Sequence, residues 1–404
     1  MTSTPEFPAA ADPAAARRAW IATFGGMLGA FMAVLDIQIT NSSLRDISGA
    51  IGATLDESSW ISIAYLVPEI VVIPLTGWIT SILGLRRYLL ATSTLFLVFS
   101  ALCGQAWSLG SMIVFRAGQG FFGGALIPLG FTAVLQMLPR EKHPTGFALF
   151  GLTAIFAPSV GPSVGGWLTD HLGWQWNFYL NLVVSPLLFG AVAYGFPRTP
   201  ARWAKLREAD GWGILLLALG LGALTTLLEE GTRDDWFGSP FIRTLAAVAA
   251  VALPLFVVWQ LRARRPVADL RLYADRNFAL GSLINVVLGA ALYGSIFLLP
   301  LYLSSVQGYS ASDIGDTLIW GGVPQLFLMP LLPWFMKRFD TRRLIAFGLV
   351  MFGASCLLNT SMSADFAHDQ LRWSLLVRAL GQPFIMIPAS ALATGGLPAG
   401  RAAA

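Results

Sequence analysis

Twelve long apolar stretches alternate with short polar connections along the 404 residues of this chain. Each stretch is close to the roughly 20 residues that a helix needs to cross the hydrocarbon core of a bilayer. Backbone polar groups find no water in that core, and a helix satisfies them within one segment. The pattern therefore predicts an all-α polytopic membrane protein with 12 transmembrane helices. These helices are expected at residues 19–41, 59–81, 88–106, 112–137, 146–168, 177–196, 211–229, 241–261, 279–304, 314–336, 343–362 and 373–395.

Composition narrows the class of protein further. Charged residues make up 12% of the chain, whereas soluble domains carry roughly 25%. Cys103 and Cys356 lie in separate apolar stretches, and the three histidines fall in short loops, so neither a disulfide framework nor a metal site is expected. The sequence contains no Gly-x-x-x-x-Gly-Lys-Ser/Thr motif and no pairing of a nucleophile with a base. We therefore expect neither an enzyme nor an ATP-driven pump, and the net charge of +4 does not indicate a nucleic-acid partner.

The basic residues indicate how the chain is oriented. If the amino terminus is cytoplasmic, 20 of the 26 Lys and Arg residues fall in cytoplasmic loops and only 4 in external ones. Such an excess is the usual signature of the cytoplasmic side. Residues 1–18 are rich in Ala and Pro and lack a signal-peptide pattern, and we interpret them as a cytoplasmic tail. The sequence thus predicts a multi-pass protein of the inner (plasma) membrane.

The two remaining arginines mark an internal repeat. Arg116 lies in MIVFRAGQGFFGGALIP and Arg378 in LLVRALGQPFIMIP, and both segments run from the outside to the inside. Two parallel repeats are typical of two-bundle secondary transporters. The register of the repeat predicts a first six-helix bundle at 19–197, an inserted helix pair with cytoplasmic linkers at 198–276, and a second bundle at 277–404. This second bundle stops after four helices, so we expect an incomplete, truncated carrier with weak or no export.

The fifth apolar stretch contains GLTAIFAPSVGPSVGG, from Gly151 to Gly166. Small residues at helical spacing allow another helix to approach closely, and Pro158 and Pro162 should bend the segment. We expect Gly161 and Gly165 to lie against the second bundle, at stretch 314–336. An ordinary helix contact without a special role is the alternative interpretation.

Three ionisable residues lie deep in the predicted helices. Asp36, Glu69 and Arg116 each cost about 2.5–3.5 kcal/mol at mid-helix, which favours burial beside a partner or a polar cavity. We expect Asp36 and Arg116 to interact, and protonation of Asp36 to change that interaction. Glu69, between Pro68 and Pro74, is a candidate second acid that meets a cationic substrate. The alternative for all three is a purely structural role.

Several motifs resemble those of one transporter family. Leu35, Asp36 and Asn41 match the first-helix motif of the EmrB/QacA-type drug:proton antiporters, the fourteen-helix branch of the major facilitator superfamily. The other matching positions are Arg116, Gln119 and Gly120 in the fourth segment, Gly151, Pro158, Gly161, Pro162, Gly165 and Gly166 in the antiporter motif, and Gly77, Gly84 and Arg86 in the cytoplasmic loop motif. Two positions depart from the family pattern, since Arg45 replaces a proline and Ser81 replaces the aspartate of the loop motif.

The resemblance implies a major facilitator two-bundle fold and proton-coupled efflux of amphipathic drugs or other small organic compounds. It implies no cofactor beyond the proton gradient, and it implies contact with lipid, protons, an organic substrate and, in two-membrane bacteria, a periplasmic adaptor and outer-membrane channel. Proton coupling is assigned to Asp36, Arg116 and Glu69. The substrate cavity is assigned to Glu69, Asn41, Gln119 and Arg378. A carrier of one specific metabolite, an inactive truncated carrier and a non-transporting membrane protein are the alternatives.

Overall fold

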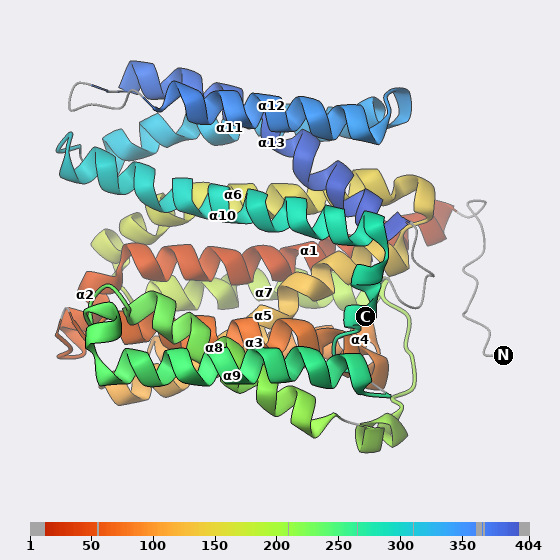
Figure 1. Ribbon diagram of the computed structural model, residues 1–404, viewed down its shortest axis with the longest axis horizontal. Coiled ribbons are helices and arrows are strands. Elements are labelled where there is room, and N and C mark those ends of the chain that lie inside the picture. Colours follow the sequence, from red (N-terminus) through yellow and green to blue (C-terminus); the bar gives the residue numbers. More distant parts are fainter. Residues whose placement is uncertain are drawn as a thin grey trace.

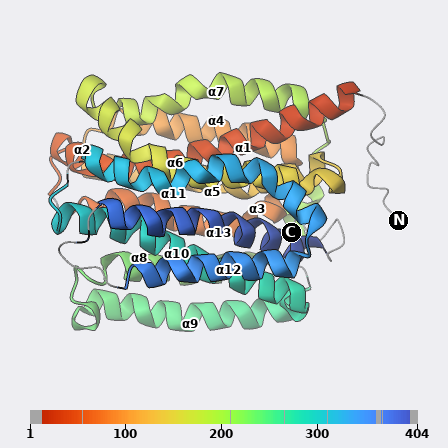
Figure 2. The same ribbon diagram turned by 90° about the horizontal axis from the view of Figure 1, so that it is seen from above.

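The computed structural model describes residues 13–54, 56–208, 210–264, 266–309, 311–360, 366 and 368–395. In this part of the chain all regular elements are helices, and the long ones lie roughly along one axis (Figures 1 and 2). Eleven helices are long and apolar enough to cross a membrane, and a bent helix raises the number to 12. The predicted all-α polytopic fold is therefore confirmed.

The first group of helices contains a short α-helix that the hydrophobic pattern did not predict. This is α2, a single short helix that follows α1 without a long connection. The helices of this group are α1 (Pro13–Ser42), α2 (Leu44–Ala50), α3 (Ser59–Leu83), α4 (Leu85–Cys103), α5 (Leu109–Met137), α6 (His143–Leu172) and α7 (Trp176–Gly195). A short 3-10 helix, η1 (Arg140–Lys142), leads into α6.

Helices α1 and α5 form the centre of this group. Helix α5 contacts α1, α3 and α4, and α1 also contacts α6 and α7. Glycines make the closest approaches possible, because a Cβ on Gly195 would lie 2.6 Å from the Cα of Ala22. Without a hydrophobic driving force in lipid, such backbone proximity is the main source of packing energy between membrane helices.

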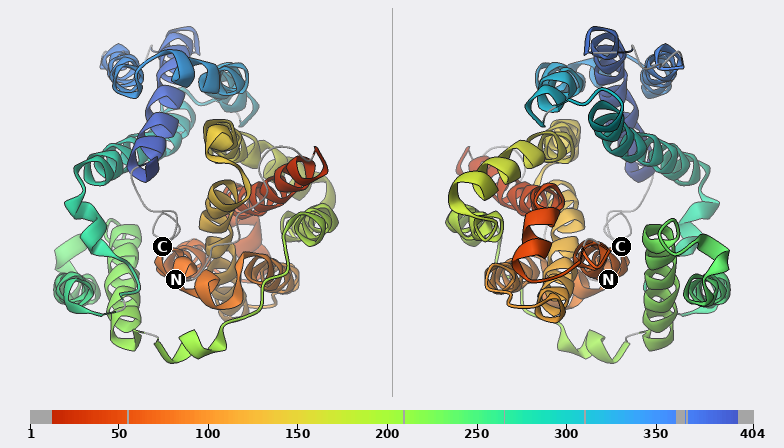
Figure 3. Two further views of the ribbon diagram at one scale, coloured as in Figure 1. Left: turned by 90° about the vertical axis from the view of Figure 1, so that its right-hand side faces the viewer. Right: turned by 90° about the vertical axis from the view of Figure 1, so that its left-hand side faces the viewer.

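The next two long helices, α8 (Gly211–Glu230) and α9 (Pro240–Arg262), form a hairpin beside α3. The 3-10 helices η2 (Trp203–Glu208), η3 (Trp236–Gly238) and η4 (Leu270–Ala274) lie before, within and after this hairpin. Asp210 links the amino-terminal end of α8 to α9. The Asp210 carboxylate accepts hydrogen bonds from Trp259 Nε1 at 2.7 Å and Gln260 Nε2 at 2.9 Å. Figure 3 shows the hairpin in green at the margin of the molecule. The exact domain limits 198–276 stay a prediction.

The last group consists of α10 (Arg276–Ser305), α11 (Ala311–Arg338), α12 (Thr341–Leu358) and α13 (His368–Gly395). Helix α13 contacts each of the other three. This group meets the first mainly through α6, which packs against α11 and α13. Met329 and Ile387 are buried there in one apolar cluster with Phe147. Helix α6 is thus the principal junction between the two groups.

Candidate functional site

The Asp36 carboxylate and the Arg116 guanidinium form a buried ion pair between α1 and α5. Arg116 Nη1 lies 2.7 Å from Asp36 Oδ2, and the two side chains are 1% and 0% exposed. The predicted contact between these residues is therefore confirmed. Removing either partner of such a buried pair leaves the other as an isolated buried charge, which is strongly destabilising.

Two amide side chains complete the environment of Asp36. Gln119 Nε2 donates to Asp36 Oδ1 at 2.9 Å, and Asn181 Nδ2 of α7 donates to the same oxygen at 2.7 Å. Asn181 Nδ2 also donates to Ser100 Oγ of α4 at 3.0 Å. Four helices therefore meet at this cluster, which we call the Asp36 cluster (Asp36, Ser100, Arg116, Gln119 and Asn181). Asn181 was not predicted from the sequence, although it is an amide within an apolar stretch.

The Arg116 side chain has further partners that fix its position. Its Nη1 also donates to Gln119 Oε1 at 2.8 Å, and its Nε donates to the backbone carbonyl of Ile61 at 3.4 Å. The ring of Tyr65 covers the guanidinium, with 4.3 Å between Arg116 Cζ and the ring centroid. Hydrogen bonds and the cation–π contact together orient the guanidinium toward Asp36.

Glycines of α5 position the α3 residues that face the cluster. A Cβ on Gly120 would lie 2.8 Å from the Cα and carbonyl carbon of Tyr65, and one on Gly124 would lie 2.7 Å from the Cα of Glu69. Helix α3 can therefore rest on α5 only where α5 lacks side chains. Gly120 and Gly124 therefore determine how closely Tyr65 and Glu69 approach α5.

Glu69 differs from Asp36 in its surroundings. Its residue is 8% exposed, and within the described part of the chain no group donates a hydrogen bond to its carboxyl. Arg116 and Asp36 lie within electrostatic range of this carboxyl, as does Tyr293 of α10. Among the described residues, Glu69 is therefore a buried acid without a hydrogen-bonding partner of its own.

The other residues assigned to a substrate cavity differ from one another in their neighbours. Asn41 is exposed and accepts a hydrogen bond from Ser62 Oγ at 2.9 Å, and Gln119 is fully buried in the Asp36 cluster. Arg378 is half-buried on α13 beside Gly321 of α11 and has no ion pair among the described residues. Within the described residues, no hydrogen bond or ion pair joins these three side chains to one another or to Glu69, and a common substrate role stays a prediction.

The loop motif lies where α3 ends and α4 begins. Gly84 has a φ of +78°, a left-handed conformation that glycine adopts without strain. Gly77 and Arg86 are half-buried on either side of it. The carbonyl of Ile82 accepts a 2.7 Å hydrogen bond from the backbone N–H of Arg202, so the turn holds the linker that leads to α8. Ser81, which replaces the aspartate of the motif, donates to Trp78 of its own helix at 2.8 Å.

The antiporter motif bends α6, but the expectation for its glycines was wrong. The axis turns by 44° between the parts ending at Pro158 and beginning at Val160, and Pro162 follows in the next turn. A Cβ on Gly165 would lie 2.9 Å from the carbonyl oxygen of Ile39, and Gly161 faces Gln38, so both glycines lie against α1.

The second bundle instead meets an earlier turn of α6. A Cβ on Gly151 would lie next to Met329 of α11 and Ile387 of α13, whereas a Cβ on Gly166 would meet nothing within 4 Å. Small residues permit close approach from either side, and their spacing does not identify which helix makes it.

Comparison with known proteins gives a consistent result. The family model described as "Major Facilitator Superfamily" matches residues 26–404. The colistin resistance protein EmrB of Acinetobacter baumannii is 33% identical over 390 residues, which cover 96% of this chain and 76% of that protein. The multidrug export protein EmrB of Escherichia coli is 32% identical over 386 residues, covering 95% and 75%. The fatty acid resistance protein FarB of Neisseria gonorrhoeae is 32% identical over 387 residues, covering 96% and 76%.

A solved structure shares the fold at low sequence identity. The proton:xylose symporter XylE aligns with a TM-score of 0.64 and 14% identity, over 96% of this chain and 85% of that chain. The helix arrangement, the family match and the relatives agree with one another, and this chain belongs to the major facilitator superfamily.

Proposed function

We propose that this chain exports amphipathic drugs or other small organic compounds across the inner membrane in exchange for protons. The observation that carries the proposal is the Asp36 cluster, because a carboxylate buried at 1% exposure is held entirely by donors. The printed names of the relatives, which include multidrug export, support the kind of substrate. No cofactor is required, since the proton gradient supplies the driving force.

Protonation of Asp36 is the coupling step in this proposal. A proton on Oδ2 removes the negative charge and breaks the 2.7 Å charge-assisted hydrogen bond from Arg116 Nη1. The guanidinium keeps Gln119 Oε1, the Ile61 carbonyl and the Tyr65 ring as partners. The attraction between α1 and α5 weakens while α5 remains tied to α3. A carrier alternates between an inward-facing and an outward-facing state. Protonation shifts the equilibrium between these states if it changes the interaction energy in one state and not in the other.

Glu69 is the proposed acid that meets the substrate. Its carboxyl has no hydrogen-bonding partner among the described residues and lies within electrostatic range of Tyr293 on α10. It is therefore free to pair with a cationic group of a bound compound. Because Arg116 and Asp36 are also within electrostatic range of Glu69, the charge state of Asp36 affects the field at that site.

The proposed placement has the amino terminus in the cytoplasm. The distribution of basic residues supports it, since Arg17 and Arg18 lie near the start of α1 and Lys337 and Arg338 lie at the end of α11. A periplasmic adaptor and an outer-membrane channel are the proposed partners in a two-membrane bacterium, in line with the resemblance described above.

The test uses proteoliposomes that contain the chain and a fluorescent amphipathic cation, ethidium. Asp36→Asn is expected to abolish accumulation driven by an imposed pH gradient while preserving exchange of labelled for unlabelled ethidium without a gradient. Asp46→Asn makes the same chemical change at an exposed position of α2 and is the matched control. Undiminished gradient-driven accumulation by Asp36→Asn would overturn the proposal.

A further inference from the structure

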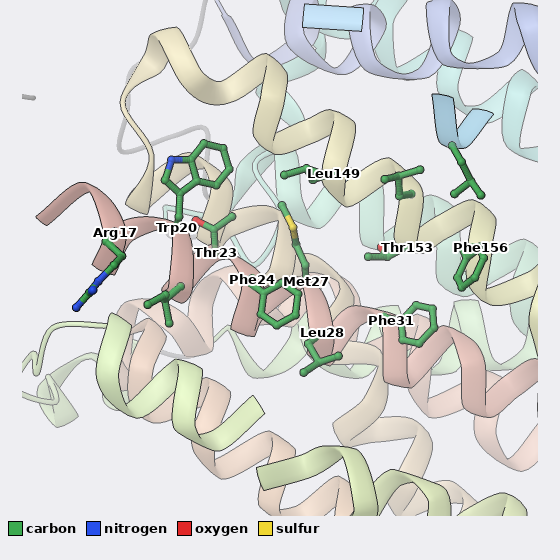
Figure 4. Close-up of a pocket in the computed structure, with 13 residues that line it drawn as sticks. Arg17, Trp20, Thr23, Phe24, Met27, Leu28, Phe31, Leu149, Thr153 and Phe156 are labelled. Carbon is green, nitrogen blue, oxygen red and sulfur yellow. The ribbon is translucent and has the colours of Figure 1, made fainter. Parts of the chain in front are cut away.

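An apolar groove lies between the amino-terminal halves of α1 and α6. It encloses about 700 Å³. Helices α1 and α6 touch at Gly161 and Gly165 but diverge before the bend at Pro158, where α6 turns toward the second bundle. The groove is the space that this divergence leaves (Figure 4). Its lining residues are Arg17, Trp20, Ile21, Thr23, Phe24, Met27, Leu28, Phe31, Leu149, Leu152, Thr153, Phe156 and Leu326.

The walls of this groove offer a ligand almost nothing polar. The hydroxyl of Thr23 donates to the carbonyl of Ala19 at 2.9 Å, and that of Thr153 donates to the carbonyl of Phe150 at 2.6 Å. Both hydroxyls are thus used within their own helices. The other lining side chains are apolar or aromatic except for Arg17, whose guanidinium is turned away from the groove toward Tyr194 of α7 (Figure 4). The body of any occupant must therefore be hydrocarbon.

Arg17 stands at one end of the groove and an aromatic pair at the other (Figure 4). The rings of Phe31 and Phe156 stack with 6.3 Å between their centroids and close the inner end. The exposed guanidinium of Arg17 donates one hydrogen bond, to Tyr194 Oη at 3.2 Å. A guanidinium has five N–H donors, so donors remain for an anionic group.

The length of the groove matches one leaflet of a bilayer. Fourteen residues separate Arg17 from Phe31, a rise of roughly 21 Å along α1. Half of a typical hydrocarbon core is about 15 Å, and half of a bilayer with its headgroup regions is about 20–22 Å. A chain that lies in the groove with its head beside Arg17 would therefore place that head at the level of the lipid headgroups. Trp20, one turn beyond Arg17, is of the type enriched at that level.

We propose that this groove binds an anionic phospholipid from the leaflet at the amino-terminal end of α1. One acyl chain lies between α1 and α6, and the phosphate pairs with Arg17. The lipid fills the wedge between the helix that carries Asp36 and the helix that joins the two bundles. Because it fits only while α6 diverges from α1, it stabilises the bent arrangement by linkage. This site is independent of the exported compound and of proton coupling.

The test incorporates the chain into nanodiscs of phosphatidylcholine with a trace of lipid that carries a photoreactive group on one acyl chain. Two probes are compared, phosphatidylglycerol and phosphatidylcholine, and adducts are mapped to peptides by mass spectrometry. Phosphatidylglycerol is expected to label residues 20–31 and 149–156 about fivefold more than phosphatidylcholine, as one added cationic contact implies. Equal labelling by the two probes would overturn the assignment.

Matched variants separate the head site from the chain site. Arg17→Gln should lower phosphatidylglycerol labelling to the phosphatidylcholine level, whereas Arg18→Gln, at a neighbouring arginine outside the groove lining, should retain most of it. Leu149→Trp should fill the groove and reduce adducts of both probes. Val183→Trp, at a position of α7 that is 67% exposed, should leave them unchanged.

Other occupants would give different results. Displacement of both probes by free dodecanoate would assign the groove to a soluble amphiphile, and cross-links between two chains would assign it to a second copy. Either result, or labelling spread evenly over α7 and α9, would overturn the proposal. Elution as a single species in size-exclusion chromatography identifies variants that remain folded.

Discussion

Tyr65 of α3 lies over Arg116 of α5 because Gly120, one turn further along α5, has no side chain. The Tyr65 ring is 4.3 Å from Arg116 Cζ, and its backbone occupies the space where a Cβ of Gly120 would be. The position of the aromatic ring, and with it the orientation of the guanidinium, therefore depends on a missing methyl group. The same contact brings Glu69 to Gly124 one turn later.

Gly120→Ala is expected to destabilise the protein by about 1–3 kcal/mol, because the added methyl group overpacks the contact with Tyr65. The measurement is the thermal midpoint in detergent. Gly190→Ala is the control, since a Cβ on Gly190 meets nothing within 4 Å. That control should be neutral or should raise stability by up to about 1 kcal/mol through helix propensity. Equal midpoints for the two variants would contradict the packing argument.

Removal of the Tyr65 ring should affect the protein through Arg116. Tyr65→Leu loses a desolvated cation–π contact worth about 2 kcal/mol. Tyr65→Phe keeps the ring and loses only the long 3.4 Å hydrogen bond to the carbonyl of Ala33, which should cost less than about 1 kcal/mol. Denaturation midpoints compare the two. A larger loss in Tyr65→Phe than in Tyr65→Leu would show that the hydroxyl, not the ring, matters.

A double-mutant cycle should reveal the coupling between Asp36 and Arg116. Arg116→Gln leaves a buried carboxylate without its counter-ion and is expected to cost about 3–5 kcal/mol. Asp36→Asn in the same chain removes the unpaired charge and should recover much of that loss without restoring gradient-driven transport. Stability and transport are measured on all four proteins of the cycle. Strict additivity of the two single losses would mean that the pair does not interact energetically.

The sequence was sufficient to predict every long helix and the contact between Asp36 and Arg116. Length and apolar composition determine where a chain crosses a bilayer, and the cost of a deep charge demands a partner. Helix α2 was not predicted, because Leu44–Ala50 is too short to show a membrane-spanning pattern. Asn181 was not recognised, since one amide in an apolar stretch does not reveal which carboxylate it will reach.

The partner of Gly161 and Gly165 could not be predicted for a related reason. Helical spacing indicates that small residues share a face, but the neighbour on that face depends on the arrangement of all the helices. The structure places α1 there, and Gly151, on a different face, meets α11 and α13. The substrate role of Arg378 and Asn41 likewise stays a prediction, because their surroundings do not include the Asp36 cluster.

The division of α6 at its bend has a consequence for building hybrid transporters. Gly161 and Gly165, after Pro158, pack against α1, whereas Gly151, before it, lies next to α11 and α13. If the second bundle were replaced with that of a relative, the part of α6 after Pro158 would therefore keep its native contacts with α1. The misfit would be concentrated around Phe147 and Gly151, where Met329 and Ile387 would be exchanged for foreign side chains. A hybrid that fails to assemble should be rescued by redesigning the helical turns around Phe147 and Gly151, not by redesigning the whole helix.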